Sequence, residues 1–235
     1  RSDSQYFQMR GRTYYIGFEK NKEALKDFNK AIQLDPKLPD NFYFRGICYF
    51  NQNKYSEALE NFNKAIQLNR SDSEYFQMRG RTYNDGFAKY KEALEDINKA
   101  IQIDPEVAEN FYFNGCFYYN LNKYSEALEN FNKAIKLNKN NSLYFQMRGR
   151  TFHFGFDKNK EALKDLNKAI QLDPEVADNF YFRGICYSNH NKYSEALENF
   201  NKAIKLNHSN SYYFQMRGRT YNDGFAKYKE ALKDL

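Results

Sequence analysis

The sequence predicts an all-α solenoid, in which short pairs of helices stack one after another along the chain. The thirteen-residue run KYSEALENFNKAI begins at Lys54 and returns unchanged at Lys123 and Lys192, so the chain repeats every 69 residues. A fixed period of this kind is typical of repeat proteins, whose units pack only on their neighbours. Within the run, Ala58 and Phe62 have the spacing of one helix face, with about 3.6 residues per turn. That apolar face predicts a helix that packs on a partner helix.

Each 69-residue unit divides into two related halves of 35 and 34 residues, and each half predicts one helical hairpin. In the first half, a glycine-bearing loop is expected at residues 15–20, and two prolines end the second helix within residues 35–40. In the second half, helices are expected at residues 41–50 and about 55–68, with a polar turn between them. The hairpins therefore occupy residues 4–38, 39–72, 73–107, 108–141, 142–176, 177–210 and, incomplete, 211–235.

The hairpins carry a short pattern that resembles the tetratricopeptide repeat. That repeat has Trp, Leu, Gly and Tyr in its first helix, Ala and Phe in its second, and a closing Pro, at a period of about 34 residues. Here Phe42, Gly46 and Tyr49 precede Ala58 and Phe62, and the same order returns along the chain. The resemblance implies a right-handed α-α superhelix of the tetratricopeptide type over the whole sequence. The glycine of the pattern stands at Gly11, Gly46, Gly80, Gly115, Gly149, Gly184 and Gly218.

The sequence departs from the family pattern in three ways. Phe replaces the Trp, the second half of each unit lacks the closing Pro, and Arg10, Arg45 or Asn114 and their equivalents stand where the family often has Leu. An Arg at that place predicts a stem laid on apolar surface and a charged head turned to solvent or to a carboxylate. None of these departures argues against the hairpins. A fainter similarity to pentatricopeptide repeats, which read RNA, keeps RNA binding as a third function.

The composition argues against several classes of function, namely nucleic-acid binding, membrane insertion and metal binding by cysteines. The formal net charge of +6 comes from 36 basic and 30 acidic residues interleaved along the expected helices, which indicates a solvated surface and makes a nucleic-acid partner unlikely. No apolar run reaches the roughly 18 residues of a membrane-spanning helix, so no membrane insertion is expected. Cys48, Cys116 and Cys186 occur once per unit and form no metal-ligand set, so they are expected to be small buried hydrophobic residues.

No catalytic, metal or cofactor site is expected. A catalytic site needs unlike groups that converge once, whereas this chain offers the same groups three or four times. The histidines His153, His190 and His208 occupy non-equivalent positions and lack metal-ligand spacing. Repeated carboxylates such as Glu57 and Glu60 stand near lysines, which indicates ion pairs on helix surfaces. We therefore expect a protein that is not an enzyme and needs no cofactor.

The resemblance also indicates where a partner would bind, because tetratricopeptide proteins generally hold extended peptides or helices in a concave groove lined by their first helices. Carried over position by position, the first unit would present Gln8, Arg12, Tyr43 and Ile47 there. Amides can bond an extended backbone, Arg can hold a carboxylate at two points, and Tyr offers flat contact area. The alternative is that the Arg pairs with an acidic neighbour and the Tyr belongs to the core. The equivalent positions in the later units are Gln77, Arg81, Tyr112, Gln146, Arg150, Tyr181, Gln215 and Arg219.

Near-identical units favour a non-enzymatic scaffold for protein–protein interaction as the function. The partner is expected to be a protein or peptide, or another copy of the chain, because lateral contacts would repeat along its length. The alternative is a structural protein whose long arrays assemble into a fibre or filament. The sequence stops in the middle of an expected second helix, which indicates an excerpt of a longer array.

Three Asn-x-Ser sequences, at Asn69, Asn140 and Asn207, are possible N-glycosylation sites. All three lie in turns that are expected to close a unit, where an enzyme could reach them. An Asn-rich chain also produces such sequences by chance. The sequence therefore leaves the location open: cytoplasmic by default, and extracellular if the sites are used.

Overall fold

The computed structural model describes residues 3–234 and shows fourteen α-helices and no strand in that range, which confirms the predicted all-α class. Within this range no helix combines the length and the apolar character needed to cross a bilayer. The chain forms two compact units, residues 1–117 and 118–235, and each is described on its own. The helices are α1 (Asp3–Phe18), α2 (Asn21–Leu34), α3 (Pro39–Phe50), α4 (Tyr55–Leu68), α5 (Ser73–Phe87), α6 (Tyr90–Ile103), α7 (Ala108–Asn120), α8 (Tyr124–Leu137), α9 (Ser142–Phe156), α10 (Asn159–Leu172), α11 (Ala177–Ser188), α12 (Tyr193–Leu206), α13 (Ser211–Phe225) and α14 (Tyr228–Ala231).

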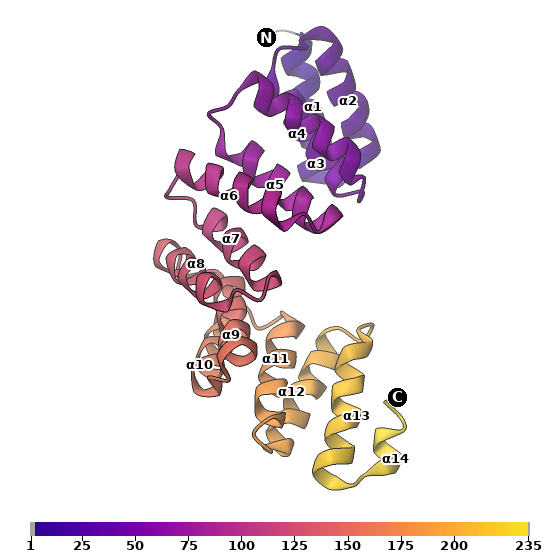
Figure 1. The fold of residues 1–235 in the computed structure, drawn as a ribbon. Helices are drawn as coiled ribbons and strands as arrows, with labels where there is room; N and C mark the ends of the chain where they lie inside the picture. The colour runs from indigo at the N-terminus through magenta and orange to yellow at the C-terminus, as the bar shows by residue number, and fades with distance from the viewer. Residues whose placement is uncertain (1–2, 235) are drawn as a thin grey trace. The chain divides into compact units, whose positions relative to one another are not determined.

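Within each unit, helices pair into hairpins in which an odd-numbered first helix is followed by an even-numbered second helix that folds back along it: α1 with α2, α3 with α4 and α5 with α6 in the first unit, and α9 with α10, α11 with α12 and α13 with α14 in the second. Figure 1 shows this for α5 and α6. The second helix predicted at residues 55–68 is confirmed as α4. The first helix predicted at residues 41–50 begins earlier, at Pro39. Proline is favourable at the first position of a helix, because its fixed φ suits the helix and the first N–H needs no partner there. The last predicted hairpin ends at Leu235, which lies outside the described residues.

The glycine-bearing loop expected at residues 15–20 is wrong, because α1 continues through Gly17 and only a two-residue turn follows. No described glycine has a positive φ, and the left-handed residue of this turn is Glu19, with φ of 52°. Packing explains why the later units keep the glycine. A Cβ atom on Gly86 would lie 2.5 Å from Cγ of Tyr55 in the preceding hairpin. The glycine therefore makes room for a neighbouring ring.

The core of each hairpin is built from the small and aromatic residues of the repeated pattern. Ala58, Phe62 and Ala65 of α4 have no exposed surface, which confirms the predicted apolar face. Gly46 of α3 allows the two helices to approach closely, because a Cβ atom there would lie 2.7 Å from the Phe62 ring. Full burial of one such Phe side chain contributes about 1.5–3 kcal/mol to folding.

The Arg that replaces the family's Leu ties three helices together. Arg79 of α5 donates from Nε and Nη2 to both carboxylate oxygens of Asp96 in α6, each at 2.7 Å. Its Nη1 donates to Oδ1 of Asn63 in the preceding hairpin, also at 2.7 Å. The hairpin of residues 39–72, which is the second half of a repeat unit, has an amide in place of this carboxylate. There Nε of Arg45 donates to Oδ1 of Asn61 at 2.7 Å. In the second unit, Arg148 and Arg217 pair with Asp165 and Asp234, and Arg183 bonds Asn199.

Two of the three cysteines are buried, as predicted, and burial raises the pKa of the Cys48 and Cys186 thiols to about 12. Because the thiolate is the nucleophile, both should be unreactive in the folded protein. Cys116 is half-buried. We expect a thiol reagent such as DTNB to modify Cys116 first at pH 8, and the other two only when the protein unfolds. A Cys116→Ser control should lose the early phase, and equal rates for three thiols in native buffer would contradict the buried positions.

Candidate partner-binding face of the first helices

The candidate site is the same face on each of three first helices, α5 in the first unit and α9 and α13 in the second, and each helix is considered on its own. It consists of the second, fifth, ninth and thirteenth residues of each helix, which lie on one side because each residue turns the helix by about 100°. We call this surface the partner face. Its residues are Glu74, Gln77, Arg81 and Asp85 in α5, Leu143, Gln146, Arg150 and Phe154 in α9, and Tyr212, Gln215, Arg219 and Asp223 in α13.

The three helices are identical at eleven of their fifteen positions, and two of the four variable positions are the ends of the partner face. The second residue changes from Glu74 to Leu143, and the thirteenth from Asp85 to Phe154. The identical positions maintain the same packing, whereas these ends change the chemistry of an exposed surface. Sequence analysis missed these residues, although aligning the repeats on one another and reading only the differences would have found them.

The predicted glutamine positions join hairpins. Nε2 of Gln77 donates to Oδ1 of Asn110 at 2.8 Å, and Nε2 of Gln146 donates to Oδ1 of Asn179 at the same distance. Gln146 is only 5% exposed. The expectation that these amides are available for a bound backbone is corrected for these two, since their donors are used inside the fold. Gln8 is half-buried, and Gln215 is exposed.

The arginines are held between aromatic rings. The guanidinium carbon of Arg81 lies 5.1 Å from the ring centre of Phe50 and 4.5 Å from that of Phe113. Arg12 lies 4.6 Å from Phe44. Stacking fixes the plane of each guanidinium, and Nη1 of Arg81 donates to Sδ of Met78 at 3.3 Å. The same arrangement holds Arg150 between Tyr119 and Phe182.

Among the described residues, Arg12, Arg81 and Arg150 form no ion pair, which differs from the alternative that these arginines pair with acidic neighbours. Arg219 follows that alternative, since its Nε lies 3.2 Å from Oδ2 of Asp223. Three of the four predicted arginines therefore lack a direct ion-pair partner among the described residues.

Of the three tyrosines predicted for the groove, Tyr43 belongs to the core, whereas Tyr112 and Tyr181 are half-buried. Tyr43 is 8% exposed, and its ring lies 5.0 Å from that of Tyr75. Burial raises the pKa of its phenol. Tyr181 is half-buried and packs 5.0 Å from Tyr213. The expectation of open, flat Tyr surfaces is corrected for Tyr43, because two successive first helices pack through this ring. The two other predicted positions, Tyr112 and Ile47, are half-buried.

In the first unit, the partner face of α5 borders an acidic cleft of about 580 Å³. Its charged lining residues are Arg12, Asp40, Asp72, Glu74 and Asp104. The carboxylate of Asp72 caps α5 by accepting from the backbone N–H of Glu74 at 3.0 Å. Burial raises the pKa of Asp72, and the charges of Glu74 and Asp40 add to the shift. A partner that bears negative charge would therefore meet repulsion at this cleft, beside Glu74.

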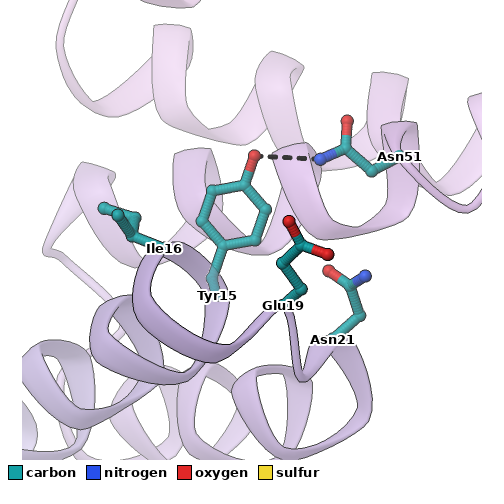
Figure 2. Close-up of a pocket in the computed structure, with 5 residues that line it drawn as sticks. All are labelled: Tyr15, Ile16, Glu19, Asn21 and Asn51. Carbon is teal, nitrogen blue, oxygen red and sulfur yellow. Dashed lines mark hydrogen bonds between the residues drawn. The ribbon is translucent and has the colours of Figure 1, made fainter.

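A second pocket, of about 410 Å³, lies at the end of α1. Figure 2 shows its lining residues, Tyr15, Ile16, Glu19, Asn21 and Asn51. Nδ2 of Asn51 donates to the Tyr15 hydroxyl at 2.9 Å (Figure 2). In the second unit, Nδ2 of Asn189 likewise donates to Nε2 of His153 at 3.1 Å. These polar pairs connect neighbouring hairpins, so we assign this pocket to the scaffold.

The three Asn-x-Ser sequences differ in accessibility. Asn140 and Asn207 are exposed, whereas Asn69 is half-buried. Oδ1 of Asn69 accepts from the backbone N–H of Ser71 at 2.9 Å, within the same Asn-x-Ser sequence. Glycosylation stays a prediction, and mass spectrometry of the natural protein tests it. Unmodified asparagine at all three positions would remove it.

Three protein-family models of the tetratricopeptide repeat match the chain at five places, which are residues 4–38, 39–72, 73–107, 108–141 and 177–210. A model of anaphase-promoting complex subunit 5 matches residues 143–188. No curated protein matches the sequence. The tetratricopeptide models together cover well over half of the chain.

Solved structures share the fold. A chain in the crystal structure of the APC/C hetero-tetramer Cut9-Hcn1 superposes with a TM-score of 0.84 at 14% identity over 92% of this chain, which spans only 42% of that chain. A tetratricopeptide repeat protein from Parabacteroides merdae gives 0.76 at 18% identity, over 98% of this chain and 90% of that one. YrrB, a TPR protein with an unusual peptide-binding site, gives 0.59 at 26% identity, over 79% of this chain and 95% of that one.

Proposed function

The chain belongs to the tetratricopeptide repeat family, and we propose that it is a non-enzymatic scaffold that binds an extended segment of a partner protein on the partner face. Proteins of this fold typically mediate protein–protein interaction. YrrB, for example, is a TPR protein with an unusual peptide-binding site. The proposal places a partner segment on α5 of the first unit or on α9 of the second, each taken on its own, where Arg81 and Arg150 form no ion pair in the described chain.

The proposal rests on the surroundings of Arg81 and Arg150. Each is stacked between two aromatic rings and forms no ion pair in the described chain. A guanidinium held in one plane loses little freedom when it binds, so its hydrogen bonds to a carboxylate or a carbonyl contribute more to affinity. These features favour recognition of a protein segment by its backbone carbonyls and acidic side chains.

Selection of binders from a random-peptide library, with the 235-residue chain as target, tests this function. We expect the selected peptides to lose about tenfold in affinity, or about 1.4 kcal/mol, when Arg81 and Arg150 are both replaced by Gln. The matched control replaces Lys99 and Lys164, which are exposed on the second helices α6 and α10, by Gln. This control removes the same charge and should leave binding unchanged. Equal losses in the two variants, or no selected peptide, would overturn the proposal.

The fibre considered from the sequence has no specific support in the arrangement of the described residues. The scaffold has the unpaired arginines in its favour. Electron microscopy of the natural protein separates the two, since filaments with an axial repeat would favour the structural role and dispersed particles favour the scaffold.

A further inference from the structure

The ends of the partner face are apolar in α9. Leu143 is 41% exposed and Phe154 is 47% exposed, and both lie on the same side of the helix as Arg150. The equivalent residues of α5 are Glu74 and Asp85. Two helices with nearly the same sequence therefore offer different surfaces: a cation between two apolar side chains in α9, and a cation between two carboxylates in α5.

The residue four positions after the arginine differs among the three helices and sets the charge on that side of the guanidinium. In α13, Asp223 occupies this place and pairs with Arg219 at 3.2 Å, as expected for oppositely charged residues four apart on a helix. In α5 the same place after Arg81 is held by Asp85, which attracts the guanidinium and repels an acidic ligand. In α9 it is held by Phe154. The α9 arginine is thus the one of the three that lacks a carboxylate on its own face.

The aromatic rings around Arg150 also position Phe154. The guanidinium carbon lies 5.3 Å from the ring centre of Tyr119 and 4.2 Å from that of Phe182. The Phe182 ring meets Phe154 edge to face, with 6.4 Å between centres. One ring of α11 therefore supports both the cation and the exposed Phe, so the two present a fixed arrangement before any ligand arrives.

We propose that this face of α9 binds an extended segment of a partner protein in which one Asp or Glu lies between two apolar residues. The inference rests on the proposed function and names the chemistry of the partner at one helix. The acidic side chain would pair with Arg150, and the apolar ones would cover Leu143 and Phe154. The positive charge of Arg150 and the lack of a carboxylate on the α9 face favour this acidic segment over a basic one. A basic segment would be better suited to the acidic cleft of the first unit.

The helix geometry sets the spacing of the three groups in the partner. At a rise of about 1.5 Å per residue, Leu143 lies roughly 10 Å from Arg150 along the axis, and Phe154 lies about 6 Å beyond it. An extended chain advances about 3.3 Å per residue. The apolar residues should therefore lie about three positions from the acid on one side and about two on the other.

Fluorescence anisotropy with a labelled synthetic peptide, Gly-Leu-Ser-Ser-Glu-Ser-Phe-Gly, tests the inference with the whole 235-residue chain. We expect a peptide with Gln in place of Glu to bind at least about tenfold more weakly. The double substitution Leu143→Glu and Phe154→Asp should abolish binding, and it is compatible with folding because α5 carries these residues naturally. The converse substitution, Glu74→Leu with Asp85→Phe, should raise the stoichiometry from one peptide per chain to two.

Two results would overturn the inference: the Glu and Gln peptides binding equally well, or the α9 double variant binding as the unchanged chain does. The proposed function is tested separately by the library selection. If selected peptides depend on Arg81 and Arg150 but lack an acid between apolar residues, the inference about α9 is wrong and the general function stands. If no peptide depends on these arginines, both are wrong.

Discussion

Replacing Arg79 by Met is expected to lower the free energy of unfolding by about 3 kcal/mol, because it leaves the carboxylate of Asp96 buried without its partner. The side chain of Asp96 is only 8% exposed, and that of Arg79 is 21% exposed. The loss includes two charge-assisted hydrogen bonds of 2.7 Å as well as the bond to the preceding hairpin. Urea unfolding followed by circular dichroism measures the change.

The matched control is Arg45→Met in the preceding hairpin. The second-helix partner of Arg45 is the neutral Asn61, so no buried charge is left behind and the loss should be about 1.5 kcal/mol, the lower end for a hydrogen bond that involves a charged group. Combining Arg79→Met with Asp96→Asn should restore much of the stability, because no buried charge then remains. Equal costs at the two positions, or no rescue by the second substitution, would contradict a role for the buried charge.

The cost of Arg79→Met should also depend on pH. Burial raises the pKa of Asp96, and Arg79 opposes that shift in the unchanged protein. Without Arg79 the pKa of Asp96 in the folded state rises further above its unfolded value. The folded state then binds a proton more readily than the unfolded state, so stability is lost as pH rises through the folded pKa and regained as pH falls. The loss of unfolding free energy caused by Arg79→Met should therefore be smaller at pH 5 than at pH 7.

Gly86→Ala is expected to lower the free energy of unfolding by about 1–3 kcal/mol, because the added methyl group would overlap the Tyr55 ring. The Cβ atom would lie 2.5 Å from Cγ and 2.6 Å from Cβ of that residue. These atoms are close to the Tyr backbone, so rotation of the ring cannot remove the overlap. The predicted consequence is weaker packing between two successive hairpins.

Gly17→Ala provides the control at the equivalent position of the first hairpin. A Cβ atom on Gly17 would meet nothing within 4 Å. Because Ala favours the helix over Gly, this substitution should leave stability unchanged or raise it by up to about 1 kcal/mol. Thermal unfolding of the two variants distinguishes packing from helix propensity, since a similar loss at both positions would mean that the Tyr55 ring is not the cause.

The regular parts of the fold were predictable because their signals are local. The helix at residues 55–68 follows from apolar spacing, and close approach at Gly46 follows from a small residue placed opposite an aromatic one. The role of Gly86 was not predictable in the same way, since the ring that it accommodates comes from the preceding hairpin. The sequence predicted a glycine-bearing loop at the equivalent residues 15–20, whereas the role of Gly86 depends on packing between repeats.

The candidate site stays a prediction, and the structure adds what surrounds its residues. The aromatic stacking of the predicted arginines depends on rings from the helices on either side, which local sequence does not specify. Tyr43 was expected in the groove and is mainly core, because it packs between successive first helices. The contrast of Glu74 with Leu143 is present in the sequence, but only the structure shows that both side chains are exposed on the same face as the arginine.

Hydrogen–deuterium exchange of the 235-residue chain, with and without a peptide selected from the library, tests the assignment of the partner face most directly. If the first helices bind the partner, exchange should slow mainly at residues 73–87 of α5 and 142–156 of α9, while the second helices keep their rates. Protection confined to second helices such as α6 and α10, with none in α5 or α9, would contradict a binding surface on the first helices.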